Sequence, residues 1–151
     1  MKGIIGIGNP LKSDDGIGVA LLREMEKREF PQQVQTFEVG IASMDLLHIL
    51  EDLDKAILID AVHFGGAPGD YCFFTPDNVD SLQESSSPHT ADILDVLELS
   101  REMGGLPEEI IIMGIEPDDT SFGEGFSKNL EENFPELKKT LYEKIGVFFE
   151  F

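Results

Sequence analysis

Runs of apolar residues bounded by turn residues alternate along this chain with stretches in which apolar positions recur at helical spacing. The strand-like runs are Lys2 to Gly8, Val34 to Val39, Lys55 to Val62, Asp70 to Thr75 and Glu109 to Gly114. The helical stretches are residues 17–27, 44–50, 90–103 and the segment from Ser127 onward, in which Pro135 predicts a kink or a restart. This alternation predicts one α/β domain over residues 1–151, a three-layer α/β/α sandwich around a mostly parallel sheet.

The direction of the fourth predicted strand follows from the short loop before it. Only about seven residues separate the run Lys55 to Val62 from the run Asp70 to Thr75. A parallel crossover needs about a dozen residues or more, so the fourth strand is expected to run antiparallel at an edge of the sheet. The continuous apolar character of the third strand predicts a central position covered on both faces. Ligands of open α/β sheets bind beyond the carboxyl ends of the parallel strands, and a site is therefore expected there.

Three polar residues at that predicted edge form the candidate site. Asp15 follows Asp14 in the loop after the first strand; Asp14 suits a helix N-cap, whereas a second adjacent acid adds like-charge repulsion unless a cation relieves it. Asp60 ends an apolar run, where a carboxylate is costly to bury unless it is paired, hydrogen-bonded or metal-bound. A cap on a loop amide is the alternative interpretation of Asp60. His89 opens the third helix, and a single histidine in such a place is more often incidental.

Taken together, the two carboxylates and the imidazole form a set that can bind a metal ion. They supply two hard oxygen donors and one nitrogen donor, and they leave coordination positions open for other ligands. Such a set accepts nickel, zinc or cadmium, and the ligand types alone do not choose among these ions. Among the remaining candidates, His48 and His63 are interpreted as structural or surface residues. Cys72, in the predicted edge strand, is interpreted as a packed residue.

The formal net charge of −19 at pH 7 is the unusual bulk property of the chain. A surface this acidic repels phosphate backbones, so we expect no nucleic-acid partner. It suits a cationic or metal-bearing protein segment, or it serves solubility alone. No apolar run approaches the roughly 18 residues of a membrane span, the N-terminus lacks a signal-peptide pattern, and the single cysteine cannot form an internal disulfide. We therefore expect a cytoplasmic protein without membrane insertion.

The opening run Gly6 to Leu11, followed by Ser13 to Gly18, resembles the first signature of the nickel–iron hydrogenase maturation endopeptidases. The similarity continues through residues 57–61 (ILIDA), Pro88-His89 and residues 114–117 (GIEP), in the same order and over nearly the whole chain. Members of this family cut a C-terminal extension from the hydrogenase large-subunit precursor once nickel has been inserted. The resemblance implies a sheet of order 2-1-3-5-4 with strand 4 antiparallel.

The resemblance also implies roles for particular residues. Asp15, Asp60 and His89 would contact the nickel that the substrate carries, and zinc or cadmium would occupy the same site in vitro. Asp15 stands where the family often has glutamate, which is longer by one methylene. After the second strand many members carry Asp-Gly-Gly-Thr, whereas this chain has Glu38 followed by Val-Gly-Ile-Ala, so the loop expected to touch the substrate differs.

The resemblance leaves two mechanisms open. The metal would polarise the scissile carbonyl or an attacking water, or an acid, Glu38 or Asp15, would act as general base in an aspartic-type cleavage. The expected catalytic set is Asp15, Glu38, Asp60 and His89. We expect a monomeric enzyme whose protein partner is the large-subunit precursor.

Two other functions compete with this interpretation. Peptidyl-tRNA hydrolases also begin with a strand and Gly-x-Gly-Asn-Pro, but they need a basic RNA-binding surface, and this chain carries Asp14 and Asp15 in that region. A metal- or nucleotide-binding sensor would use the same edge of the sheet. For a nucleotide, however, the dinucleotide fingerprint is incomplete because Leu11 occupies the position of its third glycine.

Overall fold

The computed structural model of this chain describes residues 1–40, 44–81 and 88–151, without the side chains of residues 79–92. Its strands are β1 (Lys2–Ile7), β2 (Gln35–Val39), β3 (Lys55–Ala61), β4 (Tyr71–Phe74) and β5 (Glu109–Ile115). They form one sheet in the order β2-β1-β3-β5-β4. All neighbouring pairs are parallel except β4 with β5, which is antiparallel. The predicted strand order and the antiparallel edge strand are confirmed.

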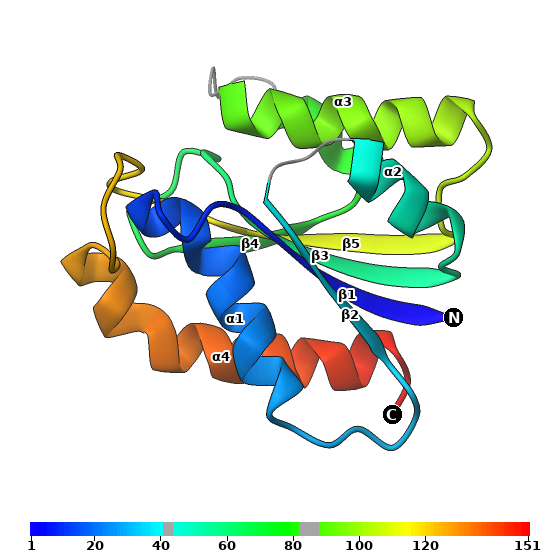
Figure 1. Cartoon of the computed structure of the whole chain (residues 1–151), viewed down its shortest axis with the longest axis horizontal. Helices are drawn as coiled ribbons and strands as arrows, with labels where there is room; N and C mark the ends of the chain where they lie inside the picture. The colour runs from blue at the N-terminus through cyan, green and yellow to red at the C-terminus, as the bar shows by residue number, and fades with distance from the viewer. Residues whose placement is uncertain (41–43, 82–87) are drawn as a thin grey trace.

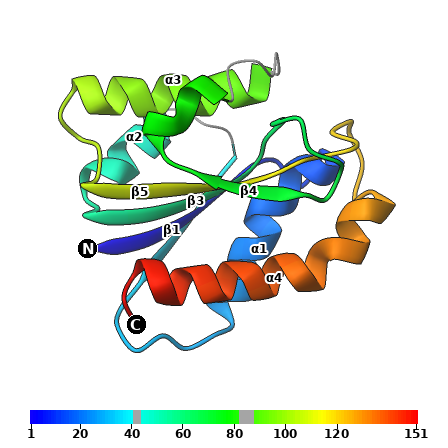
Figure 2. The same cartoon turned by 180° about the vertical axis from the view of Figure 1, so that it is seen from behind.

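Helices cover both faces of this sheet. In the described chain they are α1 (Ile17–Glu26), α2 (Met44–Glu51), α3 (Pro88–Glu102) and α4 (Lys128–Phe148), together with the 3-10 turns η1 (Ser13–Gly16) and η2 (Pro76–Ser81). Figure 1 shows α2 and α3 on one face and α1 and α4 on the other, and Figure 2 shows the same layers from behind. The predicted three-layer α/β/α sandwich is confirmed. Among the described residues, no helix combines the length and the apolar character that crossing a membrane requires.

The central strand β3 contributes to two separate apolar cores. Ile57 and Ile59 belong to the core under α1 and α4, whereas Ala56 and Leu58 belong to the core under α2 and α3. Successive residues of a strand point to opposite faces, so a strand covered on both sides needs apolar residues at every position. This requirement explains the uninterrupted apolar run from which the central strand was predicted.

The C-terminal helix α4 packs on the sheet through the apolar stripe that its sequence predicts. Leu130, Leu137, Leu141 and Ile145 are at most 1% exposed. The helix continues through Pro135 as a single element, and its first turns, in orange, are inclined to the rest in Figure 1. Proline removes one backbone hydrogen bond and crowds the preceding turn, which bends a helix that tertiary packing holds together. The prediction of a kink is thus supported, and the alternative of a restart was wrong.

Two glycines bring the turn η1 against the end of β3. A Cβ atom at Gly18, in the first turn of α1, would lie 2.2 Å from the carbonyl oxygen of Ile59. Gly8 has a φ of +137°, which L side chains rarely adopt, and a Cβ there would lie 1.8 Å from the carbonyl oxygen of Asp15. Backbone therefore packs directly on backbone at both places. This close approach brings Asp15 to the edge of the sheet at which Asp60 is the penultimate residue of β3.

Candidate functional site

Asp15 and Asp60 both lie at the carboxyl edge of the sheet, and both are buried. The turn η1, which carries Asp15, contacts β3, which carries Asp60 as its penultimate residue. Asp15 is 2% exposed and Asp60 is 0% exposed. One carboxylate oxygen of Asp15, Oδ2, accepts a hydrogen bond of 2.9 Å from the backbone N–H of Asn9. The structure thus places the two acids at the same edge, as expected, and their functional role remains a prediction.

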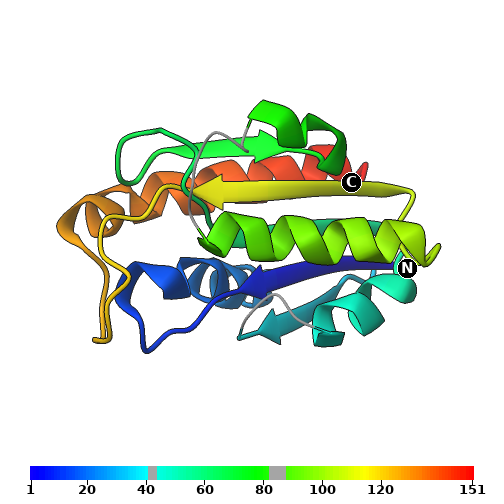
Figure 3. The ribbon, with the colours of Figure 1, turned by 90° about the horizontal axis from the view of Figure 1, so that it is seen from above.

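His89 belongs to the first turn of α3, and its side chain lies outside the described residues. Figure 3 shows β5 (yellow) pointing to the end of the sheet at which α3 (green) begins. Among the side chains that the structure describes, no three His, Cys, Asp or Glu residues gather into a group able to hold a metal ion. Because His89 is not one of those side chains, the expected set of two aspartates and one histidine stays a prediction.

Glu38, the expected alternative base, is exposed near the end of β2 and pairs with Arg23 of α1. Its Oε1 lies 2.8 Å from Nη2 of the arginine, and its Oε2 accepts a hydrogen bond of 3.3 Å from Nε. The hydrogen bond and the negative charge of Glu38 raise the pKa of Arg23. This two-point contact between guanidinium and carboxylate accounts for an acid at this position without any role in catalysis. The assignment of Glu38 as general base therefore stays a prediction.

Asp14 is a structural residue, although not through the contact that its sequence position predicts. It is 0% exposed, and its side chain caps neither η1 nor α1. Its carboxylate accepts hydrogen bonds of 2.7–3.0 Å from the backbone N–H groups of Asp118, Asp119 and Ser127 and from the hydroxyl of Ser127. The predicted cap on the following helix was wrong, because Asp14 instead holds the loop between β5 and α4. The last residue of this loop, Ser127, occupies the N-cap position of α4.

The backbone joins the same two loops beside Asp14. Lys12 and Gly123 form an isolated parallel bridge, in which Gly123 donates to the carbonyl of Leu11 and accepts from the N–H of Ser13, both at 2.9 Å. Two large apolar side chains project from the joined loops, Leu11 at 60% and Phe122 at 81% exposure. We call these two joined loops beside η1 the rim of the site. The rim is held in place by buried polar contacts and exposes apolar side chains to solvent.

Glu116 is a buried acid that was not among the residues expected at the site. It directly follows β5 and is 5% exposed. Its Oε1 accepts hydrogen bonds from the backbone N–H groups of Phe64, Gly65 and Gly66, each at 3.0 Å, and its Oε2 lies 2.7 Å from Nδ1 of His63. Successive N–H groups around one anion form a backbone nest. Glu116 thus fixes both the loop after β3 and the orientation of His63.

The sequence contains a signal that would have identified Glu116. Like Asp60, it is an acid at the carboxyl end of an apolar strand, and the two strands are neighbours in the sheet. Such an acid needs partners when it is buried, and the glycine-rich loop after β3 supplies them. The contact with Glu116 agrees with the structural interpretation of His63. His48 is 70% exposed and lies 3.9 Å from Glu51, which agrees with its interpretation as a surface residue.

Cys72 packs in β4 and is predicted to be unreactive in the folded protein. Burial, together with the charge of Glu116, raises the pKa of its thiol to about 11. Because the thiolate is the reactive form, we expect iodoacetamide to alkylate Cys72 slowly at neutral pH and faster as the pH approaches the raised pKa. In denaturant the thiol should titrate near its ordinary pKa of about 8.5. Mass-spectrometric time courses test this, and rapid labelling of the folded protein at neutral pH would contradict it.

Known proteins share both the sequence and the fold. Residues 19–144 match the family HycI, hydrogenase maturation protease. The chain is 30% identical over 142 residues to the hydrogenase 2 maturation protease of Escherichia coli (strain K12), a match that covers 91% of this chain and 87% of that protein. It is 32% identical over 132 residues to the hydrogenase expression/formation protein HoxM of Azotobacter vinelandii, and that match covers 85% of this chain. The chain spans 62% of the length of HoxM.

A solved structure supports the same relationship. The hydrogenase-maturating endopeptidase HybD from E. coli superimposes with a TM-score of 0.78 at 28% sequence identity, over 95% of this chain and 92% of that one. The likeness therefore covers nearly the whole of both chains. On the evidence of the family match and of the identity with the E. coli protease, the chain belongs to the hydrogenase maturation protease family.

Proposed function

We propose that this protein is an endopeptidase that removes the C-terminal extension of a nickel–iron hydrogenase large-subunit precursor after nickel insertion. Membership of the family supports the reaction and the class of substrate. The observation that carries the site assignment is the burial of Asp15 and Asp60 at one edge of the sheet. Buried acids at one edge of a sheet favour a cationic ligand, because a cation offsets the cost of their desolvation.

In this proposal Asp15, Asp60 and His89 recognise the nickel ion that the precursor carries. Carboxylate oxygen and imidazole nitrogen are donors that nickel accepts, and zinc or cadmium would bind the same donors in vitro. These residues hold the precursor through its metal and thereby fix the scissile bond at the edge of the sheet. Either the substrate's nickel assists the hydrolysis, or Asp15 or Glu38 accepts the proton of the attacking water.

The rim of the site supports a substrate of protein size. Leu11 and Phe122 expose large apolar surfaces on the two joined loops that border η1. Adjacent exposed apolar groups are typical of surfaces that contact other proteins, whereas small ligands are usually enclosed in pockets. The rigid attachment of these loops through Asp14 keeps the rim in position before the substrate binds.

Incubation of the protein with nickel-loaded and with nickel-free precursor tests the proposal. We expect cleavage of the loaded precursor alone, because metal recognition precedes the cut. Mass spectrometry of the large subunit identifies the loss of the C-terminal extension. Equal cleavage of both forms would show that the enzyme does not recognise its substrate through the metal. Cleavage of neither form would contradict the protease function and favour a metal- or nucleotide-binding sensor.

A further inference from the structure

A cavity of about 300 Å³ lies between β4 and α4, at the same edge of the sheet as Asp15 and Asp60. We define it as the β4–α4 groove, lined by Phe64, Asp70, Tyr71, Asn133, Glu136 and Leu137. We propose that this groove binds a lysine or arginine side chain in an extended segment of the protein substrate. The inference rests on the proposed function, because it takes the precursor as the molecule that carries this side chain.

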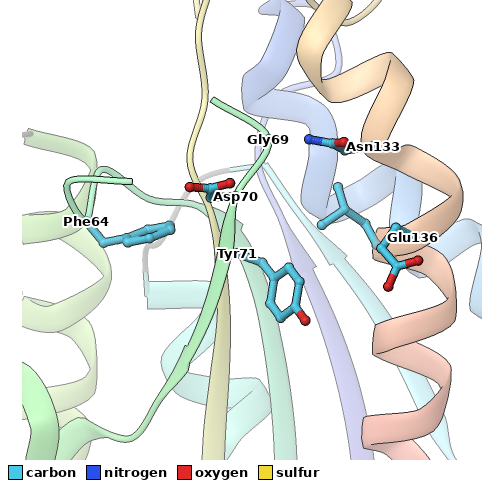
Figure 4. A pocket seen from close by; sticks show the side chains of 7 residues that line it. Phe64, Gly69, Asp70, Tyr71, Asn133 and Glu136 are labelled. Carbon is cyan, nitrogen blue, oxygen red and sulfur yellow. The ribbon is translucent and has the colours of Figure 1, made fainter. Parts of the chain in front are cut away.

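The two sides of the groove come from different layers of the fold. Figure 4 shows Tyr71 on β4 across from Asn133 and Glu136 on α4, with Gly69 and Asp70 near the top of the view. Gly69 has a φ of +92°, and a Cβ atom there would lie 2.3 Å from Nδ2 of Asn133. The contact between the chain at Gly69 and the side chain of Asn133 therefore sets the separation of the two sides at the upper end of the groove.

The lining of the groove is complementary to a long basic side chain. Phe64, Leu137 and the ring of Tyr71 provide apolar surface against which an aliphatic stem packs. Glu136 provides the charge that the head group needs, and Asp70 adds to it, although its Oδ2 already accepts a hydrogen bond of 2.9 Å from the backbone N–H of Ala67. The described lining contains no lysine or arginine. The ring of Tyr71 also attracts a cation over its face. The net charge of −19 steers a basic segment toward this protein.

The adjacent strand offers a way to bind the backbone of such a segment. Within the described sheet β4 has β5 as its single neighbour, so its outer edge carries backbone groups that an extended peptide can pair with. Figure 3 shows β4 (green) at the margin of the sheet with α4 behind it. A peptide paired along β4 passes Tyr71, and one of its side chains reaches the groove. The groove is thus adjacent to the strand edge that would set the peptide's direction.

Kinetics of the Glu136→Gln variant test the groove in the whole protein. Glu136 is exposed on α4, and glutamine keeps its size while removing its charge. We expect KM for nickel-loaded precursor to rise about fivefold with kcat unchanged, because the lost contact is equally strong in the ground state and the transition state. Glu143→Gln removes the same charge from an exposed position of α4 outside the groove and should leave KM unchanged. An unchanged KM in Glu136→Gln, or an equal rise in both variants, overturns the proposal.

A binding experiment without cleavage separates this proposal from the protease assignment. The probes are a short unstructured peptide with one arginine and the same peptide with citrulline, which has nearly the same shape and no charge. We expect the arginine peptide to shift the amide NMR signals of Asp70 and Tyr71 in a saturable manner, and Glu136→Gln to weaken this binding about fivefold. Equal shifts from both peptides, or none at these residues, reject the groove even if the protein cleaves the precursor. Arginine-specific shifts support the groove even if no precursor is cleaved.

Discussion

We expect Asp60→Asn to lower the rate of the proposed nickel-dependent precursor trimming about a hundredfold or more. Asp60 is fully buried at the carboxyl end of β3, and asparagine keeps its shape while removing the charge and one oxygen donor. A neutral amide binds a divalent ion more weakly than a carboxylate does, so under the proposed function the variant would no longer hold the precursor through its metal. The measurement is the rate at which mature large subunit appears from nickel-loaded precursor.

The control for Asp60→Asn is Asp52→Asn, which removes an acid from an exposed position before the opposite end of β3. This variant should trim the precursor at the wild-type rate. Thermal unfolding followed by circular dichroism establishes that Asp60→Asn is folded at the assay temperature. Trimming by folded Asp60→Asn at the wild-type rate would exclude metal recognition by this residue and leave its burial as a structural feature.

We expect Asp14→Ala to lower the free energy of unfolding by about 3 to 5 kcal/mol. The carboxylate of Asp14 receives hydrogen bonds from three backbone N–H groups and one hydroxyl in the loop between β5 and α4. Alanine removes all of these acceptors, and partly buried donors that lose their partner each cost free energy. Urea denaturation measures the change as a lower midpoint with a similar slope.

Two further variants make the Asp14 experiment specific. Asp118→Ala removes an exposed acidic side chain from the same loop while keeping its backbone N–H, and it should change stability by less than about 0.5 kcal/mol. Asp14→Asn retains one acceptor oxygen and should fall between alanine and the wild type. A wild-type midpoint for Asp14→Ala would show that the loop is held without this carboxylate.

The spacing of apolar residues and turns was sufficient to predict the layers of the fold and its antiparallel edge strand, whereas the strand order came from the family resemblance. The uninterrupted run of β3 indicated a strand covered on both faces, and the short loop before β4 required an antiparallel neighbour. Both inferences depend on local spacing, which the sequence displays directly. Pro135 was harder to interpret because proline either ends or bends a helix, and the outcome depends on packing. Leu130 precedes the proline and Leu137 follows it in the same core, which holds both parts of α4 on the sheet.

The candidate site was predictable only in part, because its contacts join distant segments. Asp15 was found as a second acid adjacent to Asp14, and Asp60 from the cost of burying a carboxylate after an apolar run. Both are buried at the expected edge. The partners of Asp14 lie more than a hundred residues away, in the loop between β5 and α4. The spacing of residues in the sequence does not show that this loop packs against η1. Glu116 follows the same rule as Asp60, but its role depends on the curled loop after β3, which only the folded chain shows.

The backbone nest around Glu116 affects which ligands can bind at the carboxyl edge of the sheet. In nucleotide-binding α/β proteins, converging backbone N–H groups at this edge bind the phosphates of a ligand. Here three such groups, from Phe64 to Gly66, already bind the protein's own carboxylate. The carboxylate of Glu116 thus occupies the N–H groups that a phosphate or a free carboxylic acid would otherwise bind. For the proposed protease, which would have to find one metal-bearing precursor among abundant anionic metabolites, this occupied nest would be an advantage.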